Sequence, residues 1–237
     1  MNLMDRPEYG DEARPPLLKL VPADAVTILD VGCNRGAFGA AIKKVRHAEV
    51  WGIEPDVACA EVARGRLDQV INDVFRAENP IPDNYFDLIT FNDSLEHMQD
   101  PAAALALCKA KLNQRGRIQC CVPNMRHVAT LEHLLLERDW QYQETGVRDR
   151  THLRFFTEKS IVGLFTDLGF SVISKQGINE DWWDDKKVLR RLFFRMFPEY
   201  TRDMRFQQIV VLAGIDDGGS AKSPPINVTA ETRVSSG

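Results

Sequence analysis

Short apolar runs alternate along this chain with longer stretches in which apolar residues recur every three or four positions. The short runs predict buried strands, and the longer periodic stretches predict amphipathic helices. Strands are predicted at residues 26–31, 49–53, 69–72, 86–91, 117–122, 170–175 and 207–213. Helices are predicted at residues 36–45, 56–65, 101–112, 128–138 and 158–168.

This order of elements predicts an α/β protein. Seven strands separated by helices indicate a Rossmann-like, doubly wound and mostly parallel sheet covered on both faces. Sheets of this kind bind ligands beyond the carboxyl ends of the strands, where the strand order reverses. We therefore expect functional residues just after the predicted strands.

The domain organisation follows from the same pattern. Residues 24–215 are predicted to form the main domain, after a helical or irregular cap at 1–23. Residues 216–237 are rich in Gly, Ser, Pro and Thr, which predicts a disordered tail. The stretches 125–154 and 179–205 are longer than ordinary connections and are predicted to be insertions at an acceptor site.

Composition narrows the class of protein. The 237 residues carry 30 basic and 34 acidic side chains, a net charge of −4, so we do not expect nucleic acid as a partner. No apolar run approaches the roughly 18 residues that a membrane-spanning helix needs, and the N-terminus lacks the apolar core of a secretory signal. The five cysteines are odd in number and form no CxxC pair, which indicates a cytoplasmic protein with reduced thiols.

The strongest motif is ILDVGCNRGAFG, at residues 28–39. A buried strand here runs into a glycine turn and then a helix, and Gly32 and Gly36 allow the backbone to approach a ligand closely. The glycine spacing is GxxxGxxG, which differs from the GxGxxG of dinucleotide sites and disfavours a pyrophosphate cradle. Asp30 ends the strand where its carboxylate can meet a cationic or hydroxyl-bearing ligand.

Two further carboxylates follow the next two predicted strands. Glu54 lies 18 residues after Gly36, where a carboxylate can accept hydrogen bonds from both hydroxyls of a ribose. Asp73 follows the third strand and could accept a hydrogen bond from an exocyclic amine such as that of adenine, although an Asx turn would also explain it. Together these residues indicate a nucleoside-containing ligand.

With these motifs the chain resembles the class I S-adenosylmethionine-dependent methyltransferases. The matching stretches are 28–39, WGIEPD at 51–56, NDVF at 72–75, FDLITFNDSLEHMQDP at 86–101 and GRIQCCVPN at 116–124. The resemblance implies a seventh strand that is antiparallel, and S-adenosylmethionine as the methyl donor, with S-adenosylhomocysteine as the product. Where members of the family usually carry a third glycine in the turn, this chain has Asn34, which tolerates left-handed geometry.

The resemblance also assigns the cofactor-binding residues. Glu54 would hold the ribose and Asp73 the adenine amine. The remaining assignments, along the methionine part and the other side of the cofactor, are Asp30, Gly32, Cys33, Gly36, Phe38, Asn92 and Ser94.

The downstream stretch is similar to a subfamily often found with sugar-modifying and glycan-assembly enzymes. In that subfamily a PN turn, a W-x-Y pair and a D-x-T-H-L-R-F-F-T run cover the acceptor site. Here these are residues 123–124, Trp140 with Tyr142, and residues 149–157. The resemblance implies a small-molecule or glycan-like acceptor, methylated at oxygen.

Two histidines are the candidates for a general base, because an oxygen acceptor must lose a proton and histidine titrates near neutral pH. His97 follows the fourth strand, and His152 lies in the 125–154 insertion. Either one could act as the base. A divalent cation is the alternative, because Asp93, Glu96, His97 and His152 resemble the E-x-x-E-H…H constellation of some 2′-O- and catechol-type methyltransferases. We nevertheless predict no metal site.

The second insertion combines basic and aromatic residues. Residues 186–205 hold seven basic and two acidic side chains, interleaved with tryptophan and phenylalanine. The basic side chains of Arg190, Arg191 and Arg195 would suit a phosphorylated or lipid-linked acceptor. A lid helix that packs on the core, or a homodimer contact, is the simpler explanation.

Two other functions remain open at this point. An RNA 2′-O- or base methyltransferase would have the same fold, but the net charge and the lack of an appended RNA-binding domain weigh against it. A cofactor-binding regulator without catalysis would also have this fold, but the intact motifs disfavour it.

Overall fold

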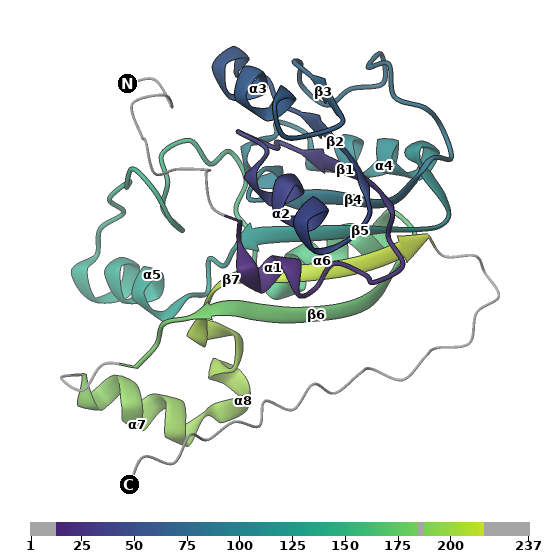
Figure 1. Cartoon of the computed structure of the whole chain (residues 1–237). Helices are drawn as coiled ribbons and strands as arrows, with labels where there is room; N and C mark the ends of the chain where they lie inside the picture. Colours follow the sequence, from purple (N-terminus) through teal and green to yellow (C-terminus); the bar gives the residue numbers. More distant parts are fainter. Residues whose placement is uncertain (1–12, 184–186, 216–237) are drawn as a thin grey trace, which may run out of the picture.

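The computed structural model describes residues 13–183 and 187–215 (Figure 1). The predicted tail at 216–237 and the first twelve residues of the predicted cap lie outside the described residues. Within the described ranges, no helix is long and apolar enough to cross a membrane.

A seven-stranded sheet forms the centre of the molecule. Its strands are β1 (Thr27–Val31), β2 (Glu49–Ile53), β3 (Gln69–Ile71), β4 (Phe86–Asn92), β5 (Leu112–Pro123), β6 (Phe170–Glu180) and β7 (Phe206–Ile215). Their order is β3-β2-β1-β4-β5-β7-β6, and β7 is antiparallel to both β5 and β6. The other paired neighbours are parallel. The predicted fold class is confirmed, and the strand order reverses between β1 and β4, which is the predicted ligand edge.

Helices cover both faces of this sheet (Figure 1). The helices of the described residues are α1 (Pro15–Leu18), α2 (Ala37–Val45), α3 (Val57–Arg64), α4 (Pro101–Lys111), α5 (Val128–Glu132), α6 (Glu158–Asp167), α7 (Val188–Met196) and α8 (Pro198–Thr201). Of these, α1, α2 and α3 cover one face and α4 and α6 the other. Local sequence explains several helix starts. Asp56 and Asp100 accept hydrogen bonds from backbone N–H groups in the first turns of α3 and α4, and Thr157 forms a capping box with Ser160.

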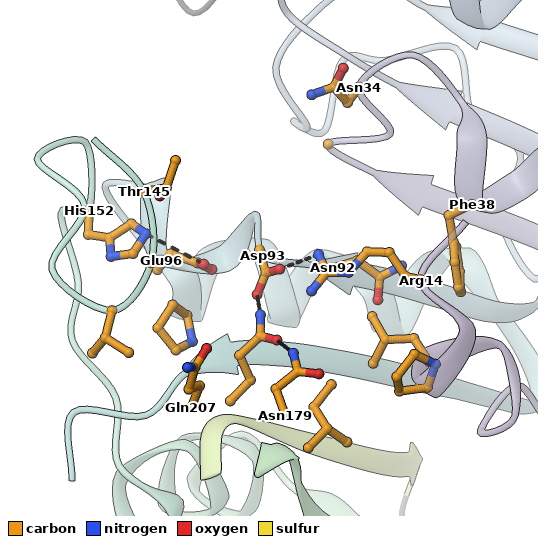
Figure 2. Close-up of a pocket in the computed structure, with 18 of the residues that line it drawn as sticks. Arg14, Asn34, Phe38, Asn92, Asp93, Glu96, Thr145, His152, Asn179 and Gln207 are labelled. Carbon is orange, nitrogen blue, oxygen red and sulfur yellow. Dashed lines mark hydrogen bonds and ion pairs between the residues drawn. The ribbon is translucent and has the colours of Figure 1, made fainter. Parts of the chain in front are cut away.

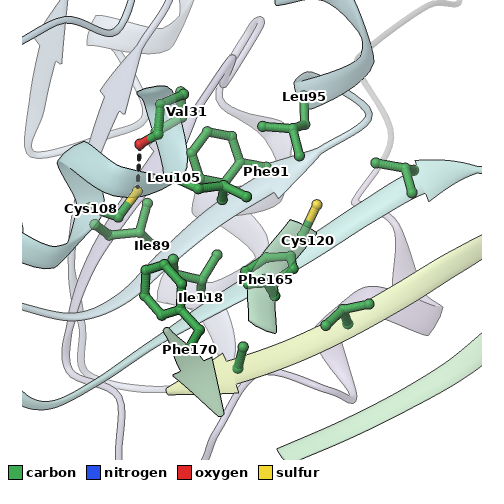
Figure 3. Close-up of a cluster of buried hydrophobic side chains, with 14 of the residues drawn as sticks. Val31, Ile89, Phe91, Leu95, Leu105, Cys108, Ile118, Cys120, Phe165 and Phe170 are labelled. Atoms are coloured by element: carbon green, nitrogen blue, oxygen red, sulfur yellow. Dashed lines mark hydrogen bonds between the residues drawn. The ribbon is translucent and has the colours of Figure 1, made fainter. Parts of the chain in front are cut away.

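Two hydrophobic cores lie on opposite faces of the sheet. One core packs α4 and α6 against the strands, and Figure 3 shows Phe91, Leu105 and Phe165 within it. The other packs α1, α2 and α3 against the opposite face. Side chains alternate between the faces of a strand, so the adjacent Cys120 and Cys121 of β5 enter different cores.

The structure differs from the predicted elements in several places. One is β5, which begins at Leu112 rather than at residue 117. The helix predicted at 128–138 is α5 followed by a π-helical turn, His133–Glu137, which ends at a left-handed residue, Arg138. The strand predicted at 170–175 continues to Glu180, into the first residues of the predicted second insertion, because its pairing with β7 extends to Phe206. Its polar, exposed residues gave no apolar signal for this extension.

Candidate active site

A cavity of about 880 Å³ opens at the carboxyl ends of β1 and β4 (Figure 2). This volume lies within the range of small-molecule sites, roughly 300–1,000 Å³. Five of the predicted cofactor residues line it: Asp30, Gly32, Cys33, Phe38 and Asn92. The cavity therefore lies at the strand-order reversal where the sequence predicts a ligand.

The glycine turn after β1 is shaped by close backbone contacts. Gly32 has a φ of 76°, and its N–H donates to the carbonyl of Ile53 at 2.8 Å. A Cβ atom at residue 32 would lie 2.6 Å from the Cβ atom of Ser94, so only glycine fits there. Asn34 adopts a φ of 49°, which is the left-handed geometry expected where the family has its third glycine.

Asp30 provides a buried acid on the cofactor side of the cavity. Its side chain accepts a hydrogen bond of 2.6 Å from the Thr90 hydroxyl. Burial raises the pKa of the Asp30 carboxyl to about 6, because the charged form loses its hydration. A cationic ligand beside this carboxyl would favour its ionised form.

Two asparagines leave polar atoms without partners beside the same space. Both side-chain polar atoms of Asn92 and the Oδ1 atom of Asn34 are buried without a hydrogen-bond partner among the described residues. Both residues line the cavity. Buried amides are nearly always hydrogen-bonded, so these atoms fit a polar ligand that supplies the missing partners.

Four predicted cofactor residues are not among those that line the cavity: Gly36, Glu54, Asp73 and Ser94. The carboxylate of Glu54 accepts one hydrogen bond from the N–H of Asn34 at 2.8 Å and another from the N–H of Asp56 at 2.9 Å. Burial raises its pKa. Glu54 thus holds the glycine turn and retains acceptor capacity for a ribose.

Asp73 and Ser94 have their own protein partners. Asp73 accepts from the N–H of Val74, and it forms an ion pair with Arg76 at 2.6 Å. The Ser94 hydroxyl donates to the carbonyl of Val31 at 2.7 Å, joining the ends of β1 and β4. The structure therefore gives Ser94 a structural contact, and it leaves the adenine assignment of Asp73 as a prediction.

The two candidate bases lie side by side on the other side of the cavity. The rings of His97 and His152 meet edge to face, with centroids 4.9 Å apart. The Nε2 atom of His152 lies 3.9 Å from Oε1 of Glu96 (Figure 2). His152 and Glu96 line the cavity, whereas His97 does not, and its Nδ1 atom lies 3.2 Å from the carbonyl of Thr151.

Burial shifts the pKa values of both His152 and Glu96. It lowers the pKa of His152, with a further contribution from nearby His97, so the neutral imidazole is favoured. Burial raises the pKa of Glu96 well above its usual value, and the charge of Asp93 raises it further. Neither carboxyl oxygen of Glu96 has a hydrogen-bond partner among the described residues. A neutral histidine beside a buried carboxyl is suited to accepting a proton.

Asp93 points to other partners. It forms an ion pair with Arg14, which precedes α1, and accepts a hydrogen bond from Gln208 of β7 (Figure 2). Ligand atoms of Glu96, His97 and His152 lie within 4.8 Å of one another, a spacing that could hold a metal ion. Asp93 is not part of this group.

Several lining residues were missed by sequence reasoning. Arg14 precedes the predicted main domain, and residues 144–147 lie in a loop that carries no motif. Gln207 and Gln208 belong to a predicted strand to which no functional residue was assigned. No local pattern marks them, because chain topology brings them to the cavity.

The predicted basic residues of the second insertion lie in α7. Arg190 is mostly buried and pairs with Glu132 of α5, with an Nε–Oε1 distance of 2.7 Å. The guanidinium of Arg191 lies over the ring of Trp183, 4.7 Å from its centroid, and Arg195 is exposed. None of the three lines the cavity.

Comparison with known proteins agrees with this geometry. The family model described as a methyltransferase domain matches residues 6–175, most of the chain. The chain belongs to this methyltransferase family. It is 35% identical over 107 residues to an uncharacterized methyltransferase of Schizosaccharomyces pombe, covering 40% of this chain and 38% of that protein.

The ubiquinone biosynthesis O-methyltransferase of Histophilus somni is 31% identical over 99 residues, covering 38% of this chain and 41% of that protein. The matched region thus spans only about two fifths of the length of these two curated relatives.

Solved methyltransferase structures share the fold. A SAM-dependent methyltransferase from Archaeoglobus fulgidus aligns with a TM-score of 0.58 at 19% identity, covering 84% of this chain and 91% of that one. The 1,6-didemethyltoxoflavin-N1-methyltransferase of Burkholderia thailandensis, solved with S-adenosylhomocysteine, aligns with a TM-score of 0.55 at 17% identity. The alignment covers 85% of this chain and 76% of that one. The family assigns S-adenosylmethionine (SAM) as the cofactor of this methyltransferase domain.

Proposed function

We propose that this protein transfers a methyl group from SAM to an oxygen atom of a small-molecule or glycan-like acceptor. The observation that supports this most strongly is that Asp30 and Asn92 line the same cavity as His152 and Glu96. One side offers an acid and open amide groups for the cofactor, and the other offers a base for the acceptor. The unpaired thiols support a cytoplasmic location.

The cofactor side has the chemistry that SAM requires. SAM supplies a methyl group already activated on a sulfonium sulfur. Asp30 would face its positively charged methionine part, Asn92 and Asn34 would pair with its polar groups, and Glu54 would hold its ribose. Gly32 keeps the backbone turn free of a side chain.

His152 is the base that we propose, because it lines the cavity and its lowered pKa keeps it neutral. It would take the proton from the acceptor hydroxyl. The carboxyl of Glu96, 3.9 Å from Nε2, would face the imidazolium that forms and stabilise it through its oxygen atoms. His97 packs against the His152 ring and would position it.

The names of relatives support oxygen as the acceptor atom. Several curated relatives are ubiquinone biosynthesis O-methyltransferases, although they match only part of this chain. The resemblance of residues 123–157 to methyltransferases of glycan assembly supports a hydroxyl-rich acceptor, and polar residues of this stretch, Glu144 and Thr145, line the cavity.

A comparison of histidine variants tests this function. His152→Asn should lower turnover by about 10²–10⁴-fold, the usual effect of removing a general base, while affinity for S-adenosylhomocysteine stays within about twofold. His133→Asn is the matched control, because His133 lies on the π-helical turn and does not line the cavity. Release of S-adenosylhomocysteine across an acceptor panel gives turnover. Full activity of His152→Asn would exclude the base.

A metal-assisted O-methyltransferase is the second candidate, favoured by the 4.8 Å grouping of Glu96, His97 and His152. In that case a divalent cation would lower the pKa of the acceptor hydroxyl. Chelation should then abolish turnover, and Mg²⁺ or Mn²⁺ should restore it. Turnover that is indifferent to chelator would leave the histidine base as the mechanism.

A further inference from the structure

Residues 187–205, here called the basic arm, comprise α7, α8 and a 3-10 turn at Asp203–Arg205. The arm projects from the end of β6, away from the helices that cover the sheet (Figure 1). Large apolar side chains on its surface are exposed, with 82% of Leu189 and 60% of Met196 accessible. With Leu192 they recur every three to four residues, which makes one apolar stripe along α7.

The basic arm is also positively charged. It holds six basic and two acidic side chains, whereas the whole chain has a net charge of −4. The rest of the molecule is therefore more acidic than the total suggests. Three of the six basic residues, Lys187, Arg190 and Arg202, pair with Glu132 or Glu158 outside the arm. The arm thus combines positive charge with exposed large apolar residues.

The stripe is exposed although the arm itself is well anchored. The opposite face of α7 buries Phe194, which stacks on Trp182 with ring centroids 4.8 Å apart. Arg190 pairs with Glu132, and the guanidinium of Arg205 lies over the Trp182 ring at 4.5 Å. The arm is thus packed against α5 through one face, and the described residues leave the apolar stripe exposed.

We propose that the apolar stripe of the basic arm docks on the surface of an anionic lipid bilayer. An amphipathic helix with basic residues and Phe, Leu and Met side chains matches the chemistry of the boundary between headgroups and acyl chains. The exposed Arg195 would add about 1 kcal/mol of attraction near an anionic surface. This inference concerns membrane binding and is independent of the proposed methyl transfer.

Charge argues against a second copy of the chain as the occupant. A two-fold dimer places the same patch of both subunits together. Here that would bring two positive arms into contact, and like charges disfavour such an interface. An anionic bilayer offers both an apolar environment for the stripe and negative charge for the basic residues.

Docking would bring the cavity close to the bilayer. The N–H of Asp181, just before the arm, donates to the carbonyl of Arg205 at its end, at 2.9 Å. The flanking residues Asn179, Gln207 and Gln208 line the cavity. The arm is therefore directly continuous with the site, and an amphiphilic acceptor held in the bilayer would lie near it.

Vesicle flotation of the full chain tests the inference without cofactor or acceptor. Vesicles of phosphatidylcholine alone are compared with an equal mixture of phosphatidylcholine and phosphatidylglycerol. We expect binding to the anionic vesicles only, weakened by salt. The double variant Leu189→Ser, Met196→Ser should lose binding, and Arg195→Gln should weaken it about fivefold.

Three matched variants control for the loss of an apolar or a basic side chain outside the arm. Val45→Ser, Val57→Ser and Arg115→Gln change exposed residues outside the arm and should leave binding unchanged. Thermal unfolding checks that every variant folds. Absence of binding to anionic vesicles, or binding that the arm variants leave intact, would overturn the proposal. So would a concentration-dependent dimer that the arm variants dissociate while vesicles are ignored.

Discussion

The two sides of the cavity are built differently. On the cofactor side, backbone atoms and short side chains within the sheet edge set the shape, as in the contacts of Gly32 and Glu54. On the acceptor side, His152 and residues 144–147 come from an inserted segment. The first side is thus part of the core, whereas the second can change without altering it. Substitutions on the cofactor side should therefore change stability and cofactor affinity together.

Gly32→Ala should give the largest effect. The new Cβ atom would meet Ser94 at 2.6 Å, and the left-handed backbone disfavours alanine. We expect a loss of about 2–4 kcal/mol in the free energy of unfolding and more than about 100-fold in affinity for S-adenosylhomocysteine. Denaturant titration and calorimetry measure both.

Gly163→Ala is the control for this substitution. A Cβ atom there meets nothing within 4 Å, and the residue lies inside α6. It should stabilise the protein by about 0.5–1 kcal/mol. If wild type and Gly32→Ala had the same free energy of unfolding, the turn would not be rigid. The cofactor side would then be no more tied to the core than the acceptor side.

Asp30→Asn should change how stability depends on pH. The pKa of Asp30 is raised from 3.8 to about 6, so between these values the folded protein holds a proton that the unfolded chain has released. The contribution of Asp30 to stability is therefore full below pH 3.8 and falls by up to about 3 kcal/mol as the pH rises through 6. Denaturant titrations from pH 4 to 7 should show this fall in wild type and a smaller one in the variant. Parallel curves would contradict it.

Glu54→Gln should weaken affinity for S-adenosylhomocysteine about tenfold. The carboxylate accepts N–H groups of Asn34 and Asp56 through its two oxygens, and an amide can accept through only one. Glu61→Gln is the matched control, because Glu61 is exposed on α3 and pairs with Arg64. Calorimetry that finds unchanged affinity for Glu54→Gln would remove the ribose assignment.

Glu132→Gln should have the smallest effect and tests the acceptor side. It weakens the ion pairs with Arg190 and Lys187, which should cost about 1 kcal/mol of stability. Affinity for S-adenosylhomocysteine should stay unchanged, because the pairs lie outside the cavity. Thermal unfolding and calorimetry measure the two quantities. A loss of affinity comparable to that of Glu54→Gln would show that the two sides are coupled.

Sequence reasoning succeeded where local pattern and position coincide. Apolar strands, glycine turns and residues directly after strands predicted the sheet and the placement of Asp30, Gly32 and Asn92. It could not find Arg14 or Gln208, because they reach the cavity through the packing of α1 and the antiparallel pairing of β7. Sequence reasoning also could not choose between His97 and His152 as the base, because which of them lines the cavity depends on how the 125–154 insertion folds.

The adjacent thiols of β5 give the molecule internal chemical reporters. Cys120 belongs to the core under α4 and α6, and Cys121 to the core under α1, α2 and α3. Burial raises the pKa of both thiols, so neither reacts until its own layer opens. Pulses of an alkylating reagent followed by peptide mass mapping would therefore time the opening of each layer separately, at two neighbouring positions of one strand.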